Sequence, residues 1–126
     1  NIEIIQREDI CGHVRRVGPY FSECLSSLSD LGIVGDVRGS HFMQCVENVA
    51  DKETKELFGP SVHVGDRVAG ACEKRGLIVR PIAHLNVLSP PLVLTVEQID
   101  WMVDVLRDGI IEVQADLVAE GLWNPA

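Results

Sequence analysis

The stretch Gly76–Leu94, GLIVRPIAHLNVLSPPLVL, decides how we expect this chain to fold. One apolar run, Leu77–Val79, ends at a single arginine, Arg80. A second apolar run, Asn86–Leu88, ends at a Ser-Pro-Pro sequence that interrupts regular structure before a long helical pattern. Short apolar runs bounded by turn residues are typical of β-strands. The stretch therefore predicts two short strands with an arginine at their margin.

Arg80 is the residue of this stretch that carries chemistry. It is followed at once by Pro81, which restricts the backbone and ends regular pairing. A guanidinium held at a fixed place in a partly dry cleft binds a carboxylate or a phosphate through two parallel hydrogen bonds. The alternative is that Arg80 closes a surface ion pair, which contributes little to stability and has no functional role.

Length and composition indicate one globular domain over residues 1–126. The chain is 46% hydrophobic and 24% charged, which is enough apolar material for one core. Its formal net charge is -8, so it has no basic surface for nucleic acid or for an anionic membrane. No apolar stretch is long enough to span a bilayer, and the first residues do not resemble a signal peptide.

The spacing of the cysteines indicates the redox compartment in which we expect the protein to reside. They form no C-x-x-C pair, which gives no support to zinc or thioredoxin-like chemistry. We expect reduced, largely buried thiols in a cytoplasmic protein, and a disulfide framework is the alternative; the four are Cys11, Cys24, Cys45 and Cys72. The first residue is asparagine and not methionine, which suggests a fragment of a longer protein.

The N-terminal part predicts a helix followed by two strands. Apolar residues recur at helical spacing over residues 2–31, and Gly18–Pro19 predicts a kink or two abutting helices. Gly32 stands where a left-handed helix cap is expected. Residues 33–38 and 41–49 then predict two strands joined by a turn or bulge at residues 39–40.

The C-terminal part predicts a helix, the two strands of the opening stretch and a final helix. The first helix covers residues 61–75, with Gly76 as its cap. Thr95–Gln98 matches a capping box at the start of the last helix. The apolar stripe of this last helix comprises Ile99, Met102, Val103, Leu106, Ile110, Val113 and Leu117. Short connections favour an α+β fold, in which three helices pack on a small antiparallel sheet.

No complete catalytic set appears among the residues. The four histidines lack metal-ligand spacing, and only His84 lies near Arg80. Asp36 and Glu47 are placed to pair with Arg38 across a hairpin. The lysines stand in charged, solvated surroundings that do not favour Schiff-base chemistry; they are Lys52, Lys55 and Lys74. One anion-binding arginine without partners is unusual for an enzyme and natural for part of one.

Three blocks of the sequence together resemble the C-terminal portion of class III aminotransferases that depend on pyridoxal phosphate, the omega-transaminase group. Their order and spacing carry the resemblance, which extends from about residue 10 to residue 117. The blocks are residues 13–21 with 33–39, residues 43–47 with 51–54, and residues 76–81 with 89–92 and 95–100.

The resemblance implies the small C-terminal domain of a fold-type I enzyme, whose large domain in the same chain holds pyridoxal phosphate. The lysine and aspartate that contact this cofactor in the family have no match here, so the fragment alone is expected to be inactive. The implied reaction transfers an amino group between an amine or amino acid and a keto acid such as pyruvate. Arg80 matches the arginine that binds the substrate carboxylate and swings aside for uncharged substrates. The implied assembly is a cytoplasmic homodimer.

The sequence departs from the family pattern at two places. Ser40–Phe42 replaces a frequent Gly-Leu, and Ile82–His84 lacks a glycine that is frequent after the Arg-Pro pair. Aminomutases and decarboxylases belong to the same class, so the cofactor is implied more firmly than the reaction. The alternative to a piece of an enzyme is a stand-alone α+β module that binds a partner or a small ligand.

Overall fold

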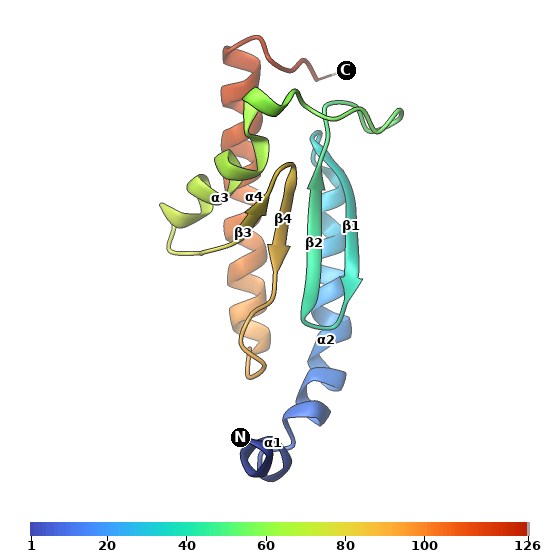
Figure 1. The fold of residues 1–126 in the computed structure, drawn as a ribbon, viewed down its shortest axis with the longest axis vertical. Helices are drawn as coiled ribbons and strands as arrows, with labels where there is room; N and C mark the ends of the chain where they lie inside the picture. Colours follow the sequence, from blue (N-terminus) through green and yellow to red (C-terminus); the bar gives the residue numbers. More distant parts are fainter. Residues whose placement is uncertain (126) are drawn as a thin grey trace.

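A computed structural model describes residues 1–125 of the chain. The α-helices and strands follow one another in the order two helices, two strands, helix, two strands, helix (Figure 1). None of the described helices is long and apolar enough to cross a membrane. The elements are α1 (Ile2–Arg7), α2 (Ile10–Ser26), the 3-10 turn η1 (Ser27–Asp30), β1 (Val34–Ser40), β2 (Met43–Asn48), the 3-10 turn η2 (Pro60–Val62), α3 (Val64–Glu73), β3 (Arg80–Ile82), β4 (Leu85–Leu88) and α4 (Val96–Ala119).

The four strands form one antiparallel sheet in the order β1-β2-β4-β3. Helices α2 and α4 lie behind this sheet in Figure 1, and α3 contacts both α4 and the β3–β4 hairpin. Side chains alternate between the two faces of each strand. The face that the helices cover carries the buried residues, and we call the opposite face the outer face. The expected α+β fold with a small antiparallel sheet is confirmed.

Helix α4 follows its sequence pattern closely. The Thr95 side chain accepts a hydrogen bond from the backbone N–H of Gln98, and the Gln98 side chain accepts one from the backbone N–H of Thr95. This is the predicted capping box, which satisfies two backbone donors at the start of the helix. Every residue of the predicted apolar stripe is buried.

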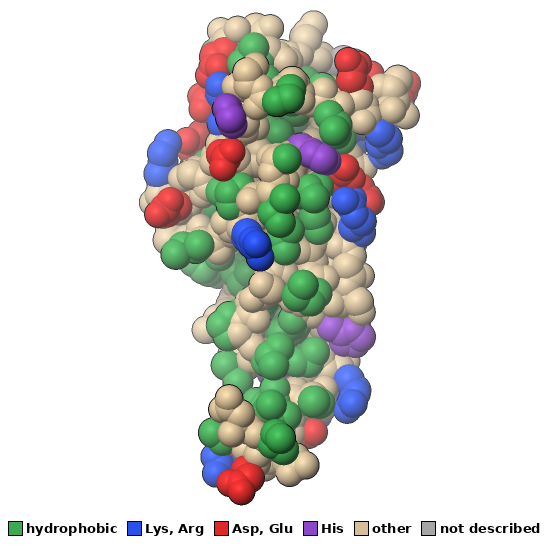
Figure 2. All heavy atoms as spheres, viewed as in Figure 1, with side chains coloured by type: hydrophobic (Ala, Val, Ile, Leu, Met, Phe, Trp, Pro, Cys, Tyr) green, Lys and Arg blue, Asp and Glu red, His purple; other side chains and the backbone are tan. Residues whose placement is uncertain are grey.

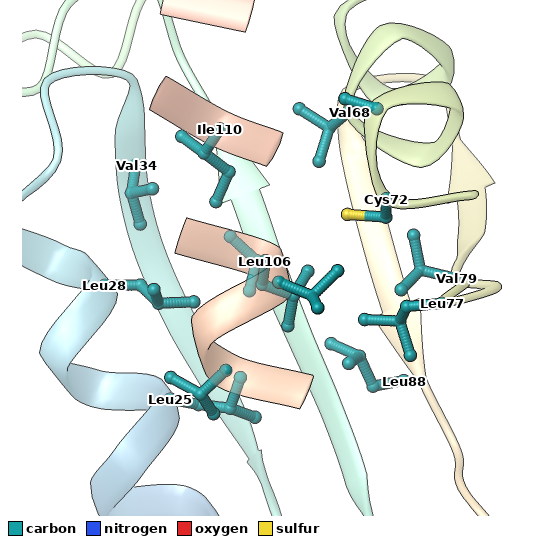
Figure 3. Close-up of a cluster of buried hydrophobic side chains, with 14 of the residues drawn as sticks. Leu25, Leu28, Val34, Val68, Cys72, Leu77, Val79, Leu88, Leu106 and Ile110 are labelled. Carbon is teal, nitrogen blue, oxygen red and sulfur yellow. The ribbon is translucent and has the colours of Figure 1, made fainter. Parts of the chain in front are cut away.

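The core lies between α4, the sheet and the two other long helices (Figure 3). Each fully buried Leu, Ile or Val contributes roughly 1.5–3 kcal/mol to folding relative to an exposed position. Figure 3 labels members from every layer, namely Leu25, Leu28, Val34, Val68, Cys72, Leu77, Val79, Leu88, Leu106 and Ile110.

The first helical region breaks at a different place from the one expected. Helix α2 continues through Pro19, and the interruption lies at Asp9, whose backbone is left-handed with φ 47°. Pro19 is exposed, so the carbonyl of Arg15 that it leaves without a helical partner can bind water. Asp9 instead begins α2, since its Oδ1 accepts a hydrogen bond from the backbone of Gly12 at 3.2 Å.

Gly32 does not adopt the left-handed conformation that we expected of it, since its φ is not positive. A Cβ atom at this position would lie 2.5 Å from the ring of Trp123. That indole donates from Nε1 to the backbone oxygen of Ala50 at 3.0 Å. Close packing against Trp123 therefore explains why position 32 is a glycine. Gly76, by contrast, has φ 90° and follows α3 as predicted.

Strand boundaries also differ from those expected. The turn between β1 and β2 lies at His41–Phe42, because Gly39 stays in the ladder opposite Gln44. Leu77–Val79 forms no strand, and Arg80 begins β3 instead of ending a strand. Leu77 and Val79 are buried, so the apolar run enters the core and does not join the ladder.

Two smaller expectations also need correction. The helix expected over residues 61–75 begins at Val64, after η2 and a left-handed His63 with φ 52°. The thiols are less buried than expected, because Cys11 is exposed while Cys72 is buried. Burial raises the pKa of the Cys72 thiol to about 11, which makes it a poor nucleophile. No disulfide links the described cysteines.

We predict that Gly65→Ala destabilises the protein by about 1–3 kcal/mol. The added Cβ would lie 2.3 Å from the backbone oxygen of Ala83, so α3 and the β3–β4 hairpin would have to move apart. Gly70→Ala in the same helix is the matched control, because its Cβ would meet nothing within 4 Å. That control should stabilise by about 1 kcal/mol. Urea unfolding measures both changes, and equal shifts of the two midpoints would contradict this account.

We also predict that Ala83→Gly stabilises the protein. Ala83 has φ 53°, a left-handed conformation that costs a non-glycine residue about 1–2 kcal/mol. Glycine removes this cost, but it also increases the conformational entropy of the unfolded chain. The net stabilisation should therefore be about 0.5–1 kcal/mol. The same change in α3, Ala69→Gly, should destabilise by about 1 kcal/mol. Thermal unfolding of the two variants should move in opposite directions.

Candidate functional site

Arg80 lies on the outer face of the sheet. In the ladder it pairs with Val87 on β4, Val87 pairs with Cys45 on β2, and Cys45 pairs with Arg38 on β1. Residues directly opposite each other in a sheet point to the same face, so these four side chains form one row across it. The buried neighbour Val46 belongs to the other face. Figure 2 shows this side of the molecule, on which hydrophobic side chains gather along the middle and most charged side chains lie toward the margins.

The Arg80 side chain is exposed and has no partner among residues 1–125. It makes no side-chain hydrogen bond or ion pair with any of them, and its nearest neighbours in the ladder are apolar. Val87 lies opposite Arg80, and Ile82 and Leu85 form the next pair on the same face. A cation in apolar surroundings without a counter-ion is free to bind an anion from outside this part of the chain.

A cavity of about 540 Å³ adjoins Arg80. It lies between the start of β3, the end of β4, the loop at residues 89–91 and the first turns of α4. Among the described residues that line it, Arg80 carries the only charge, and Leu77, Pro90, Leu94 and Met102 supply apolar walls. Apolar walls exclude water and strengthen a guanidinium–carboxylate hydrogen bond. The cavity suits an organic carboxylate.

Arg38, at the other end of the same row, is already neutralised. It donates to Asp36 at 3.0 Å and also to Glu47, as predicted across the hairpin. Glu47 additionally contacts His84, with 2.9 Å between Oε1 and Nε2. The hydrogen bond from Arg38, followed by that from His84, lowers the pKa of Glu47 despite its partial burial. His84 therefore belongs to this ion-pair cluster, although it is close to Arg80 in sequence.

The described residues do not fit pyridoxal phosphate, since no lysine is available at the cavity. The Nζ of Lys52 donates to the backbone oxygen of Ser29 at 2.6 Å, and that of Lys55 to Gly35 at 2.7 Å. Lys74 pairs with Glu112. Lys52 and Lys55 thus fasten the loop after β2 to neighbouring backbone, although we expected all three lysines in solvated surroundings. Residues 1–125 also contain no group of three side chains that could hold a metal ion.

Sequence reasoning singled out Arg80 but missed the walls of the cavity. The sequence identified Leu94 only as a loop residue and Met102 only as part of the apolar stripe of the last helix. Their place in the cavity wall depends on how α4 packs. It also missed two buried amides, Asn48 and Asn86. The available signal was an asparagine inside the apolar run Leu85–Leu88.

We predict that Glu47→Gln lowers stability at pH 7 but not at acidic pH. The folded protein holds the pKa of Glu47 below its ordinary value of 4.5, so the carboxylate stabilises the fold above that pH. This contribution is lost as the pH falls through the lowered pKa. The difference in unfolding free energy between the two proteins should therefore shrink between pH 7 and pH 3. Glu23→Gln, at a carboxylate without an ion pair among residues 1–125, is the control, and an equal pH dependence there would refute the prediction.

Comparisons with known proteins agree on one family. The family model for class III aminotransferases matches residues 1–110. An uncharacterized aminotransferase of Sinorhizobium fredii is 40% identical over 123 residues, which is 95% of this chain and 26% of that protein. The adenosylmethionine-8-amino-7-oxononanoate aminotransferase of Methanocaldococcus jannaschii is 38% identical over 92% of this chain and 25% of its own length.

Solved structures give the same result. The omega-transferase of Vibrio fluvialis JS17 superposes with a TM-score of 0.90 at 36% identity, covering 94% of this chain and 28% of that one. The crystal structure of the Methanocaldococcus jannaschii enzyme gives a TM-score of 0.84 at 37% identity, covering 88% and 25%. The chain thus spans about a quarter of the length of these relatives. On the matching family model and these relatives, the chain belongs to the class III aminotransferases.

Proposed function

We propose that this chain is the C-terminal small-domain portion of a longer aminotransferase that depends on pyridoxal phosphate. The enzyme would transfer an amino group between an amine or amino acid and a keto acid such as pyruvate. Family membership supports the reaction class, and structures of the Vibrio fluvialis relative are described as PMP-bound and PLP-bound. When bound, pyridoxal phosphate supplies the electron sink for this chemistry. Because the described residues do not fit the cofactor, its contacts belong to parts of the enzyme outside this chain.

The role that we propose for Arg80 is to bind and orient the carboxylate of the substrate. One observation carries the proposal: Arg80 is a cation without a counter-ion among the described residues, and it lines a mostly apolar cavity. Its planar guanidinium matches a carboxylate with two parallel hydrogen bonds, which fixes orientation as well as charge. An uncharged substrate would leave these bonds unmade and would be bound by its other groups.

Exposed apolar residues support a large domain of the same polypeptide as the partner. Met43 on the outer face is 63% exposed, and Ile78 beside the cavity is 86% exposed. Ile2 in α1, a helix with no buried residue, is 73% exposed. Such a surface fits contact with another part of a protein better than contact with water. The relatives, about four times as long as this chain, favour the enzyme over a stand-alone module. A cytoplasmic homodimer is part of the proposal, and light scattering of the full-length enzyme tests the dimer.

We predict that Arg80→Ala in the full-length enzyme raises the KM for pyruvate about 10- to 100-fold, since a charged hydrogen-bonded pair contributes roughly 1.5–3 kcal/mol. The KM for butylamine, which has no carboxylate, should stay within about twofold of the wild type. Steady-state kinetics with each substrate varied in turn measures both values.

Two further variants sharpen this test. Arg80→Lys keeps the charge but loses the paired hydrogen bonds, so its KM for pyruvate should fall between those of the wild type and Arg80→Ala. Arg15→Ala removes another exposed arginine that has no ion pair among residues 1–125, and it should change neither constant. Equal losses with pyruvate and butylamine for Arg80→Ala would remove the role assigned to Arg80.

A further inference from the structure

Two fully buried asparagines connect the hairpin that carries Arg80 to the rest of the molecule. Asn48 Nδ2 donates to Asn86 Oδ1 at 2.8 Å and to the backbone oxygen of His84 at 2.9 Å. Asn86 Nδ2 donates to the backbone oxygen of Gly65 at 2.9 Å. Both side chains are 0% exposed. The pair thus joins the end of β2, strand β4 and the first turn of α3.

Within the sheet, Arg80 is held by this hairpin only. Strand β3 is an edge strand of three residues that pairs only with β4. Pro81 in its middle has no N–H to donate, and Leu77–Val79 before it is outside the ladder. Arg80 pairs with Val87, the residue after Asn86. Whatever fixes β4 against β2 and α3 therefore helps to fix the arginine, together with the buried Val79 that precedes it.

Stability does not account for the asparagine pair. Replacing two buried, mutually bonded polar groups by apolar groups of similar shape is often nearly neutral. This pair is also incompletely satisfied, since Asn48 Oδ1 has no hydrogen-bond partner among residues 1–125. A directional polar pair instead selects one register of the strands, because any other register would leave the two amides without their hydrogen-bond partners. A slip of one residue would turn Arg80 from the outer face of the sheet to the covered one.

We propose that Asn48 and Asn86 are positioning residues for Arg80. They hold the β3–β4 hairpin in the one register that presents the guanidinium on the outer face beside the cavity. This inference rests on the proposed role of Arg80 in binding a substrate carboxylate, and it adds that the binding depends on two amides on the opposite face of the sheet.

The test compares Asn86→Leu with Gln44→Leu in the full-length enzyme. Gln44 is the matched control, because its buried amide lies on the same face of the sheet but anchors the other hairpin. Its Nε2 donates to Ser22 Oγ at 2.6 Å and to the backbone oxygen of His41 at 2.9 Å. Both variants should lose stability. Only Asn86→Leu should raise the KM for pyruvate, by about tenfold, with the KM for butylamine unchanged.

The double variant Asn48→Leu with Asn86→Leu separates positioning from stability. It leaves neither amide unpaired, so it should unfold at a higher urea concentration than Asn86→Leu while keeping the raised KM for pyruvate. If Asn86→Leu does not accumulate as folded protein, this double variant replaces it in the comparison with Gln44→Leu.

Three results would overturn the inference. One is an equal rise of the KM for pyruvate in the Asn86 variants and in Gln44→Leu, and another is an equal rise for pyruvate and butylamine in the Asn86 variants. The third is no change at all in a folded Asn86 variant. Arg80→Ala, measured in parallel, identifies what has failed. If Arg80→Ala raises the KM for pyruvate selectively and the Asn86 variants do not, only the positioning role of the asparagines is refuted. If Arg80→Ala itself shows no selectivity between pyruvate and butylamine, the proposed function is refuted as well.

Discussion

The burial of α4 is the interaction on which the rest of the structure depends. Nine of its residues are buried, and its apolar side chains belong to one core cluster with residues of the sheet, α2 and α3. The sheet has only four short strands and could not be stable without this cover. Gly109 lets α3 approach closely, because a Cβ there would lie 3.1 Å from Cys72 Sγ. The same helix supplies Met102 to the cavity, so the wall beside Arg80 is an extension of the core.

Each hairpin of the sheet rests on a glycine of a helix. A Cβ on Gly18 of α2 would lie 2.7 Å from the backbone of His41, in the turn between β1 and β2. A Cβ on Gly65 of α3 would lie 2.3 Å from the backbone oxygen of Ala83, in the turn between β3 and β4. Both turn residues have positive φ, although neither is glycine. Close contact between helix and turn therefore helps to hold backbone conformations that these residues rarely adopt.

Local patterns predicted some of these features well. The capping box and apolar stripe of α4, the cap at Gly76 and the pairing of Arg38 with Asp36 and Glu47 depend on residues close in sequence or on one ladder. The alternation of helices and strands followed from the same short-range signals. Such signals are reliable when burial and propensity point the same way.

The features that escaped prediction depend on tertiary contacts. An apolar run such as Leu77–Val79 is equally compatible with a strand and with a buried irregular segment, and packing selected the second. Pro19 is tolerated inside α2 because that side of the helix is exposed. The cavity beside Arg80 and the Asn48–Asn86 pair join residues from separate elements, so no local pattern could place them together.

Pro81 has a further consequence for the sheet as a whole. In β3 it occupies the middle of a three-residue strand at the edge of the sheet. An edge of this kind offers few backbone donors to an incoming chain, which is how natural proteins avoid edge-to-edge aggregation. Lateral growth of the sheet is therefore disfavoured next to Arg80. Pro81, although it stays within the ladder opposite Asn86, thereby also protects the margin of the proposed binding site from intermolecular β-association.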